Sequence, residues 1–373
     1  MDLKKRNPAA DLIRVLAFFL VVSVHFFKHN GFYANTVEGE RMFVMMVMRA
    51  FFIICVPLFL MLSGYLLQRK QLEKKYYLRI IPIILTYVLA SLFCLGYCVI
   101  FQDYDLTLRN TVLSILDYSA APYAWYIEMY IGLFLLIPFL NIVYNTLPSQ
   151  KHKIWLIVTF IILTALPSVL NVYDLKSFDW LALPSSSSKL NKTVPNWWQN
   201  IYPITYYYIG CYVKEYGLKI NKALNAALII ICTVLSGAYC YWRSYKVGFI
   251  WGEWCSYESL VNIILTLLVF VFIINLNYDK FPNVLAKIVQ KISGLTLCAY
   301  LVSWVFDDML YPILSEKIPT ATDRLEYYFV IVPTVFILSL FVSYLLSKIQ
   351  LLIEKIFSLL VEMISNKKSK KTI

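Results

Sequence analysis

The chain has 373 residues, of which 60% are hydrophobic and only 15% are charged. A soluble domain has nearer to about 45–50% apolar and about 25% charged residues. The composition therefore excludes a soluble enzyme and predicts an all-α, polytopic integral membrane protein. The net charge of +12 does not indicate nucleic-acid binding, because basic residues of membrane proteins collect in cytoplasmic loops. We expect a lipid bilayer as a partner and no nucleic acid.

Ten apolar segments are expected to span the membrane, since a helix needs about 20 apolar residues to cross a hydrocarbon core of roughly 30 Å. The polar stretches between them are too short for a second globular domain. We therefore expect a membrane domain over residues 1–347 and a cytoplasmic, amphipathic and basic tail over residues 348–373. The ten segments are 9–28, 44–67, 78–101, 124–146, 153–172, 199–213, 222–242, 257–275, 292–311 and 326–347.

The distribution of charge between the loops sets the expected orientation. If the N-terminus is cytoplasmic, the cytoplasmic segments hold 22 of the 34 Lys and Arg residues, and the other side holds 11. Acidic residues show the opposite bias, with six on the cytoplasmic side and 14 on the outer side. The positive-inside rule then predicts that both termini are cytoplasmic, which requires an even number of spans. We expect a multi-pass protein of the inner, cytoplasmic membrane.

The first span carries three ionisable residues, Asp11, Arg14 and His25. It lacks a small-residue cleavage site, so we interpret it as a retained helix and not as a signal peptide. A charge inside the bilayer costs at least about 2.5–3.5 kcal/mol on insertion scales, so it needs a partner or a function. At 100° per residue, Arg14 and His25 share one helix face and lie about 16 Å apart along the axis. Asp11 lies one turn before Arg14 and is expected to pair with it.

When the expected helices are aligned by their depth in the membrane, the polar residues fall into two clusters, one toward the outer side and one toward the cytoplasmic side. Glu128 starts the fourth span at the expected level of His25, and Asp307 and Asp308 close the ninth span on the same side. A histidine with a carboxylate partner suits general-base chemistry on a hydroxyl. A basic cluster at the level of Arg14 suits a phosphorylated cytoplasmic donor. The expected members of that basic cluster are Arg14, Ser63, Tyr65, Lys74, Lys75 and Arg79.

Each of these features has a structural alternative. The pair of Asp11 and Arg14 also reads as a plain ion pair, and His25 as an interfacial histidine bonded to a backbone carbonyl. Glu128 also reads as a structural hydrogen-bond partner. The basic loop residues satisfy the positive-inside rule without binding anything. The Ser63-Gly64 pair is also a small-residue motif of helix packing.

Metal binding finds little support in the sequence. His25 and His29 have the spacing of two ligands on one helix face, but no third ligand has a matching spacing. The eight cysteines form no CxxC pair and suggest neither a zinc site nor a disulfide framework. We expect no metal and no permanently bound cofactor. Tryptophans near the expected interfaces form an aromatic belt or line a sugar-binding surface; they are Trp125, Trp155, Trp197, Trp198, Trp242, Trp251 and Trp254.

Five segments, in chain order, carry the motifs of a known family. The first reads DLIRVLAFFLVVSVH and holds Asp11, Arg14 and His25. The others read VPLFLMLSGYLL, RIIP, AWYIEMYIGLFLLIP and YYYIGCYVKEY. With these motifs the chain resembles, over nearly its whole length, the acyltransferase-3 family of membrane O-acyltransferases, which acylate carbohydrates of bacterial envelopes. It departs from the family at Ser303, where relatives often have a histidine, and at Lys74-Lys75, where arginines are common.

The resemblance implies acyl-CoA, most often acetyl-CoA, as a cytoplasmic donor substrate. It also implies that Arg14 and His25 are required for transfer. With Glu128 as their neighbour, these are the expected catalytic residues, and the basic cluster is expected to bind the donor. His25 either removes the proton of the acceptor hydroxyl or carries the acyl group itself. Both routes stay open at this point.

The expected function is therefore a membrane O-acyltransferase. It moves an acyl group, in the first place acetyl, from cytoplasmic acyl-CoA to a hydroxyl of an envelope or exopolysaccharide sugar. The alternative is a transporter or flippase for a polysaccharide or a lipid-linked sugar, with aromatic residues along its path. The absence of a visible internal repeat gives no support to inverted transporter halves. A third interpretation is a membrane-bound sensor that uses the same pocket without turnover.

Overall fold

The computed structural model describes residues 7–105, 107–177, 179–182, 184–186 and 190–369. Within these ranges every regular element is a helix, and the one isolated β-bridge joins Val37 to Tyr245. The prediction of an all-α protein is confirmed. The first six residues of the predicted membrane domain and the last four of the predicted tail lie outside the described residues.

Long helices alternate with short ones along the chain, as expected for spans that are joined by loops. The α-helices are α1 (Pro8–His29), α2 (Gly39–Phe52), α3 (Cys55–Leu67), α4 (Lys74–Tyr77), α5 (Ile81–Phe101), α6 (Leu108–Leu116), α7 (Trp125–Thr146), α8 (Gln150–Thr164), α9 (Pro167–Leu170), α10 (Asp179–Ala182), α11 (Tyr202–Tyr216), α12 (Lys222–Arg243), α13 (Leu260–Ile274), α14 (Asn283–Ser293), α15 (Thr296–Lys317) and α16 (Tyr328–Ser369). The 3-10 helices are η1 (Phe32–Ala34), η2 (Leu78–Ile80), η3 (Pro184–Ser186), η4 (Gln199–Ile201), η5 (Glu253–Cys255), η6 (Tyr278–Lys280) and η7 (Asp323–Tyr327).

Eight helical segments among the described residues are long and apolar enough to cross a membrane. They coincide with eight of the ten predicted spans, which confirms a polytopic membrane protein. The other two predicted spans, 153–172 and 199–213, contain α8 and α11, which have only 15 residues each. At 1.5 Å per residue each helix is about 22 Å long, shorter than a hydrocarbon core of roughly 30 Å. These two short helices pack against each other.

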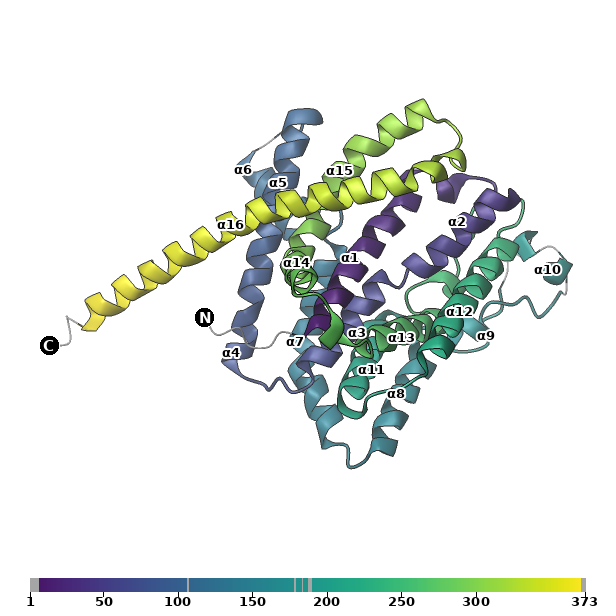
Figure 1. The fold of residues 1–373 in the computed structure, drawn as a ribbon, viewed down its shortest axis with the longest axis horizontal. Helices are drawn as coiled ribbons and strands as arrows, with labels where there is room; N and C mark the ends of the chain where they lie inside the picture. The colour runs from purple at the N-terminus through teal and green to yellow at the C-terminus, as the bar shows by residue number, and fades with distance from the viewer. Residues whose placement is uncertain (1–6, 106, 178, 183, 187–189, 370–373) are drawn as a thin grey trace.

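Helix α1 lies in the middle of the bundle, in contact with α2, α3, α13, α14, α15 and α16 (Figure 1). It begins sharply because the side chain of Asn7 accepts hydrogen bonds from the N–H groups of Ala9 and Ala10. Pro8 fits at the first position, where its missing N–H leaves no hydrogen bond unmade. Because helices surround α1, 13 of its 22 residues are buried. Its polar residues can therefore face protein instead of lipid.

Helices α3 and α11 cross at two glycines. A Cβ atom added to Gly64 would lie 1.9 Å from the carbonyl oxygen of Tyr207, and one added to Gly210 would lie 1.9 Å from the carbonyl oxygen of Met61. No side chain fits at either position, so the two backbones touch directly. The packing role expected for Gly64 is confirmed, and this crossing fixes the position of the neighbouring Ser63.

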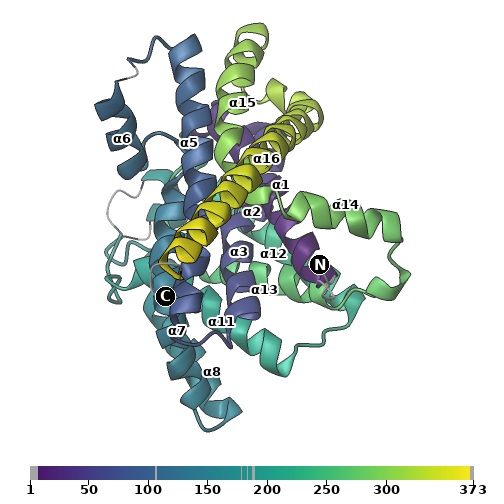
Figure 2. The ribbon, with the colours of Figure 1, turned by 90° about the vertical axis from the view of Figure 1, so that its left-hand side faces the viewer.

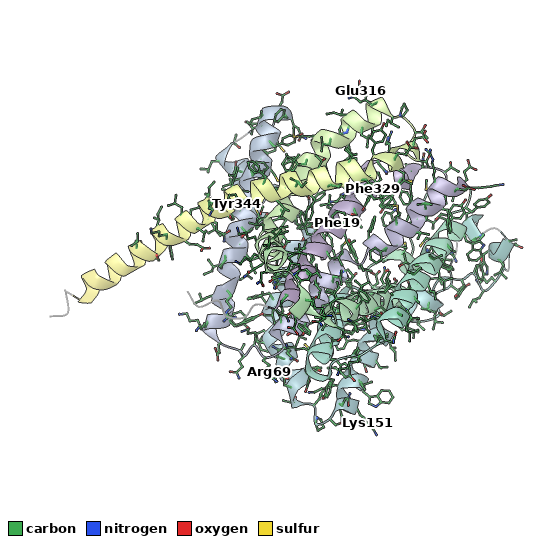
Figure 3. All side chains as sticks on the ribbon, viewed as in Figure 1. Phe19, Arg69, Lys151, Glu316, Phe329 and Tyr344 are labelled. Atoms are coloured by element: carbon green, nitrogen blue, oxygen red, sulfur yellow. The ribbon has the colours of Figure 1, made fainter. Side chains whose placement is uncertain are left out.

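Two of the loops that were predicted on the cytoplasmic side lie toward the same end of the bundle. In Figure 3, Arg69 and Lys151 lie toward the lower edge, whereas Glu316, near the end of α15, lies at the upper edge. The first two residues belong to loops with a predicted cytoplasmic location, and the third follows a span that ends on the outer side. The arrangement agrees with the alternation of the predicted spans.

Four described α-helices were not predicted as separate elements, namely α4, α6, α10 and α14. Figure 2 shows α14 beside α1, with which it is in contact. The amphipathic α14 ends at Ser293, directly before α15, and so brings this serine to the N-terminal half of α1. At the other end of the chain, α16 continues beyond the bundle (Figure 1), in agreement with a helical start of the predicted tail.

Candidate active site

The first part of the site is an ion pair on α1 that α14 completes. Arg14 Nη1 lies 3.2 Å from Asp11 Oδ1 and donates to it. The same nitrogen lies 3.4 Å from Ser293 Oγ, and Ser293 Oγ donates to Asp11 Oδ1 at 2.6 Å. The predicted pairing of Asp11 with Arg14 is confirmed. Ser293, which lies 279 residues further along the chain than Arg14, was not predicted as a member of the site.

A cavity of about 280 Å³ opens beside Arg14, and we call it the Arg14 cavity. Ser63 also lines it, with a hydroxyl that donates to the carbonyl of Phe59 at 2.9 Å. The structure thus brings together two of the residues predicted to bind a donor. Most of the remaining wall is apolar or aromatic, which is the usual form of a small-molecule site with a few orienting polar groups. That wall includes Val21, Val56, Tyr126, Tyr130 and Tyr300.

The other residues predicted to bind the donor do not line this cavity. Tyr65 is buried, and its ring packs against Phe270 of α13, with centroids 5.6 Å apart. Tyr65 follows Ser63 by two helix positions, so the Tyr65 side chain points about 200° around the helix axis from the Ser63 side chain. The three basic residues are exposed on α4 and η2, outside the cavity, so their contact with a donor stays a prediction; they are Lys74, Lys75 and Arg79.

The second part of the site surrounds His25 on the same helix. His25 Nδ1 lies 3.4 Å from Oδ2 of Asp307, a fully buried residue of α15. Tyr123, in the loop before α7, donates its hydroxyl to the same Oδ2 at 2.7 Å. The Tyr123 ring lies against the His25 imidazole, with centroids 3.9 Å apart. A carboxylate beside Nδ1 favours the tautomer with its proton there and leaves Nε2 as the basic nitrogen.

His29 extends this network by one helical turn. Its Nε2 lies 2.6 Å from the hydroxyl of Tyr123. Because that hydroxyl donates its hydrogen to Asp307, its oxygen accepts the bond from His29, which places a proton on Nε2 of His29. The hydroxyl of Tyr300 donates to the backbone carbonyl of Tyr123. These bonds hold α1, α15 and the loop before α7 in one arrangement around the buried carboxylate.

The predicted pairing of His25 with Glu128 is wrong. Glu128 is exposed in the first turn of α7, and none of the side-chain hydrogen bonds and ion pairs among the described residues involves it. Its neighbours Tyr126 and Ile127 are buried, so α7 turns Glu128 away from the core. Depth in the membrane fixes the position of a residue along a helix axis but not its direction around that axis. Asp307 is the carboxylate at His25.

A second cavity, of about 490 Å³, borders His25, and we call it the His25 cavity. Trp125 and Trp251 are among its lining residues, so two of the candidate tryptophans border a site. The Arg14 cavity and the His25 cavity have three lining residues in common, namely Val21, Val56 and Tyr300. Val21 lies on α1 between Arg14 and His25, as the predicted common face of these two residues requires.

The structure also locates two further features of the sequence, the serine at position 303 and the pair of histidines on the first helix. Ser303, which replaces the histidine of many relatives, is fully buried and donates to the carbonyl of Tyr300 at 2.8 Å. Among the described residues, no group of three or more His, Cys, Asp or Glu side chains is arranged to hold a metal ion. His29 instead bonds to Tyr123. The polar network at His25 therefore consists of hydrogen-bonding and acid–base groups.

Comparison with known protein families identifies the chain. A family model described as an acyltransferase domain matches residues 7–348. The comparisons with curated proteins and with solved structures give no match. The matched region holds both cavities and the network around Asp307. The chain therefore belongs to the acyltransferase-3 family and is a membrane acyltransferase.

Proposed function

We propose that the protein transfers an acyl group, in the first place acetyl, from cytoplasmic acyl-CoA to a hydroxyl of an envelope or exopolysaccharide sugar. The observation that carries this proposal is the pair of cavities with a common wall, one at Arg14 and one at His25. Acyl-CoA is a long molecule with phosphates at one end and a thioester at the other. The rise along α1 of about 16 Å between the two residues suits such a donor.

The Arg14 cavity would take the arm of the donor. A guanidinium binds phosphate through paired N–H groups, and the aromatic wall suits the less polar arm that leads to the thioester. A volume of about 280 Å³ is below the roughly 300–1,000 Å³ of pockets for drug-sized ligands. We therefore place the nucleotide end outside the cavity, toward the exposed basic residues Lys74, Lys75 and Arg79.

His25 then acts as the general base. Its Nε2 takes the proton of the acceptor hydroxyl while the hydroxyl oxygen attacks the acyl carbonyl carbon. The new C–O bond forms, the C–S bond breaks, and the imidazolium returns the proton to the thiolate of coenzyme A. Asp307 Oδ2 lies 3.4 Å from Nδ1, which makes no hydrogen bond in the structure, and the nearby carboxylate favours a proton on that nitrogen. Because this tautomer leaves Nε2 of His25 free to accept a proton, we favour His25 as a general base over His25 as a carrier of the acyl group.

The His25 cavity would hold the acceptor. Trp125 and Trp251 border it, and aromatic rings pack well against the apolar faces of sugars. Trp251 is itself held in place, because it stacks on Tyr33 with ring centroids 4.6 Å apart. A rigid aromatic surface beside the base would place a sugar hydroxyl at Nε2.

The test is transfer of label from radioactive acetyl-CoA, in membrane vesicles, to alkali-labile esters on carbohydrate. We expect His25→Ala to lower this transfer at least about 100-fold, the lower end of the usual effect of a general base. The matched control is His152→Ala, because His152 is an exposed histidine on α8, outside both cavities.

Unchanged ester formation in His25→Ala at equal protein abundance would contradict the proposal. The transporter alternative predicts the opposite pattern in cells. There His25→Ala would leave the esters on the polymer unchanged, and substitution of Trp125 or Trp251 would reduce the amount of exported polymer.

A further inference from the structure

We infer that the His25 cavity selects an acceptor sugar that carries a negative charge, either a carboxylate or a phosphate. The inference rests on the proposed function, since it takes the acceptor to be a carbohydrate. It assigns the chemical class of that acceptor. The observations that support it concern two cationic side chains in the wall of the cavity, Arg49 and Lys28.

Arg49, on α2, is a buried cation with an incomplete set of partners. Its side chain is 2% exposed. Nε donates to the hydroxyl of Tyr33 at 3.1 Å, and Nη1 lies 3.5 Å from the carbonyl oxygen of Cys255. Nη2 is buried and has no hydrogen-bond partner, and none of the ion pairs of the described residues involves Arg49.

Aromatic rings supply part of what a carboxylate would supply. The Arg49 guanidinium lies 4.6 Å from the ring centroid of Phe249, 5.2 Å from that of Trp251 and 5.6 Å from that of Tyr33. Cation–π contacts stabilise the charge but accept no conventional hydrogen bond. A buried donor without an acceptor destabilises the protein, and more so when it is charged. The guanidinium therefore keeps its positive charge in the lining of the cavity without an ion-pair partner among the described residues.

Lys28 adds a second positive charge to the same wall, one helical turn from His25. It is exposed, and its Nζ lies 5.1 Å from the ring centroid of Tyr123. Among the described residues, no Asp or Glu lines the cavity. Two cationic side chains in the lining of one cavity attract ligands of the opposite sign. The cavity that His25 borders thus carries two groups that attract an anion and repel a cation.

Arg243 is a second buried arginine that packs against aromatic rings, and it allows a comparison with Arg49. It is 2% exposed, lies 4.2 Å from the ring centroid of Trp254 and donates to the carbonyl of Val172 at 2.7 Å. Like Arg49, it has a buried nitrogen without a partner, Nε. It does not line either cavity. What distinguishes Arg49 is therefore its place in the lining of the cavity that Lys28 and His25 also line, which makes Arg243 a matched control.

The experiment measures binding of three sugars to the full-length protein in lipid nanodiscs: glucose, glucuronate and glucose 1-phosphate. Binding is followed by calorimetry at low and at high salt. We expect at least one of the two anionic sugars to bind about tenfold more tightly than glucose, and the difference to shrink as salt screens the charges. Comparison of glucuronate with glucose 1-phosphate decides between a carboxylate and a phosphate.

Two variants connect the preference to the cavity. Lys28→Gln should reduce the preference about threefold to tenfold without affecting the fold, because Lys28 is exposed. Its control is Lys246→Gln, an exposed lysine 5.6 Å from the ring centroid of Tyr245 and outside the cavity, which should leave the preference unchanged. Arg49→Gln should abolish the preference, whereas Arg243→Gln should retain it even if it lowers thermal stability.

Equal or undetectable binding of all three sugars would overturn the inference, as would a preference that survives Lys28→Gln and Arg49→Gln. Failure of the inference and failure of the proposed function give different results. If acetyl is transferred equally well to neutral and anionic sugars, the proposed function stands and the inference fails. If anionic sugars bind preferentially but receive no acetyl, the inference stands and the proposed function fails.

Discussion

The two cavities use polar groups in different ways. In the Arg14 cavity, the charged partner of the cation is Asp11, one turn away on the same helix, and Ser293 of α14 also contacts both residues. In the His25 cavity, the ionisable group is completed by partners from distant parts of the chain. Asp307 lies 282 positions after His25, and Tyr123 reaches the same carboxylate from the loop before α7.

This difference indicates a division of labour. A locally paired arginine beside a mostly apolar wall is suited to hold a charged ligand without moving its protons. A histidine whose tautomer is set by a buried carboxylate is suited to exchange protons. We therefore expect substitutions at the Arg14 cavity to change the KM for the donor, and substitutions in the His25 network to change kcat. The three predictions below test this separation in the acetyl-transfer assay.

The largest effect is expected for Asp307→Asn. The amide keeps the shape of the side chain but removes the charge that holds His25 in its tautomer, so kcat should fall about 100-fold. The KM for acetyl-CoA should stay within about twofold. The control is Asp308→Asn, because Asp308 accepts hydrogen bonds from Tyr97 and Gln102 instead. A rise in KM with an unchanged kcat would break the proposed separation of the two cavities.

An intermediate effect is expected for Arg14→Gln. Glutamine can still donate a hydrogen bond to Asp11, but it has lost the charge that would bind a phosphate. The KM for acetyl-CoA should rise about tenfold or more, because a hydrogen bond to a charged group contributes about 1.5–3 kcal/mol.

The control for Arg14→Gln is Arg41→Gln, which removes an exposed arginine paired with Asp323 and Glu326. The KM of the Arg41→Gln variant for acetyl-CoA should not change. Kinetics for Arg14→Gln in which only kcat falls would assign Arg14 to the chemical step and remove the distinction between the cavities.

The smallest effect is expected for Tyr123→Phe. Loss of the hydroxyl leaves His29 Nε2 and Asp307 Oδ2 without their common partner, while His25 keeps its contact with Asp307. We expect kcat to fall about fivefold, which corresponds to about 1 kcal/mol for a lost hydrogen bond.

Tyr311→Phe is the matched control for Tyr123→Phe. The Tyr311 ring stacks on His29 with centroids 5.4 Å apart, and its buried hydroxyl has no hydrogen-bond partner. Its loss should therefore leave kcat unchanged. If both variants have the same kcat, the hydrogen bonds of the Tyr123 hydroxyl do not contribute to the rate of transfer.

The sequence by itself determined the features that depend on a single helix. The apolar segments predicted eight of the ten expected spans, because the thickness of a bilayer fixes the length of a helix that crosses it. The period of 100° per residue predicted that Asp11 and Arg14 pair and that Arg14 and His25 share a face. Ser63 was also placed correctly at the Arg14 cavity, next to a glycine that packs against another helix.

Only the tertiary structure decided which residues meet from different helices. Depth put Glu128 and Asp307 at similar levels, but the rotation of α7 and α15 about their own axes decided that Asp307 faces His25. Tyr123 and Ser293 were not predicted as site residues. Tyr123 lies in a loop, and Ser293 lies at the start of the predicted span 292–311, where depth alone does not show which way a serine faces. Arg49 did give a signal, as a charge within the apolar segment 44–67, but its place at the His25 cavity depends on packing. Helical periodicity relates residues within one helix, whereas packing alone fixes how one helix is turned toward the next.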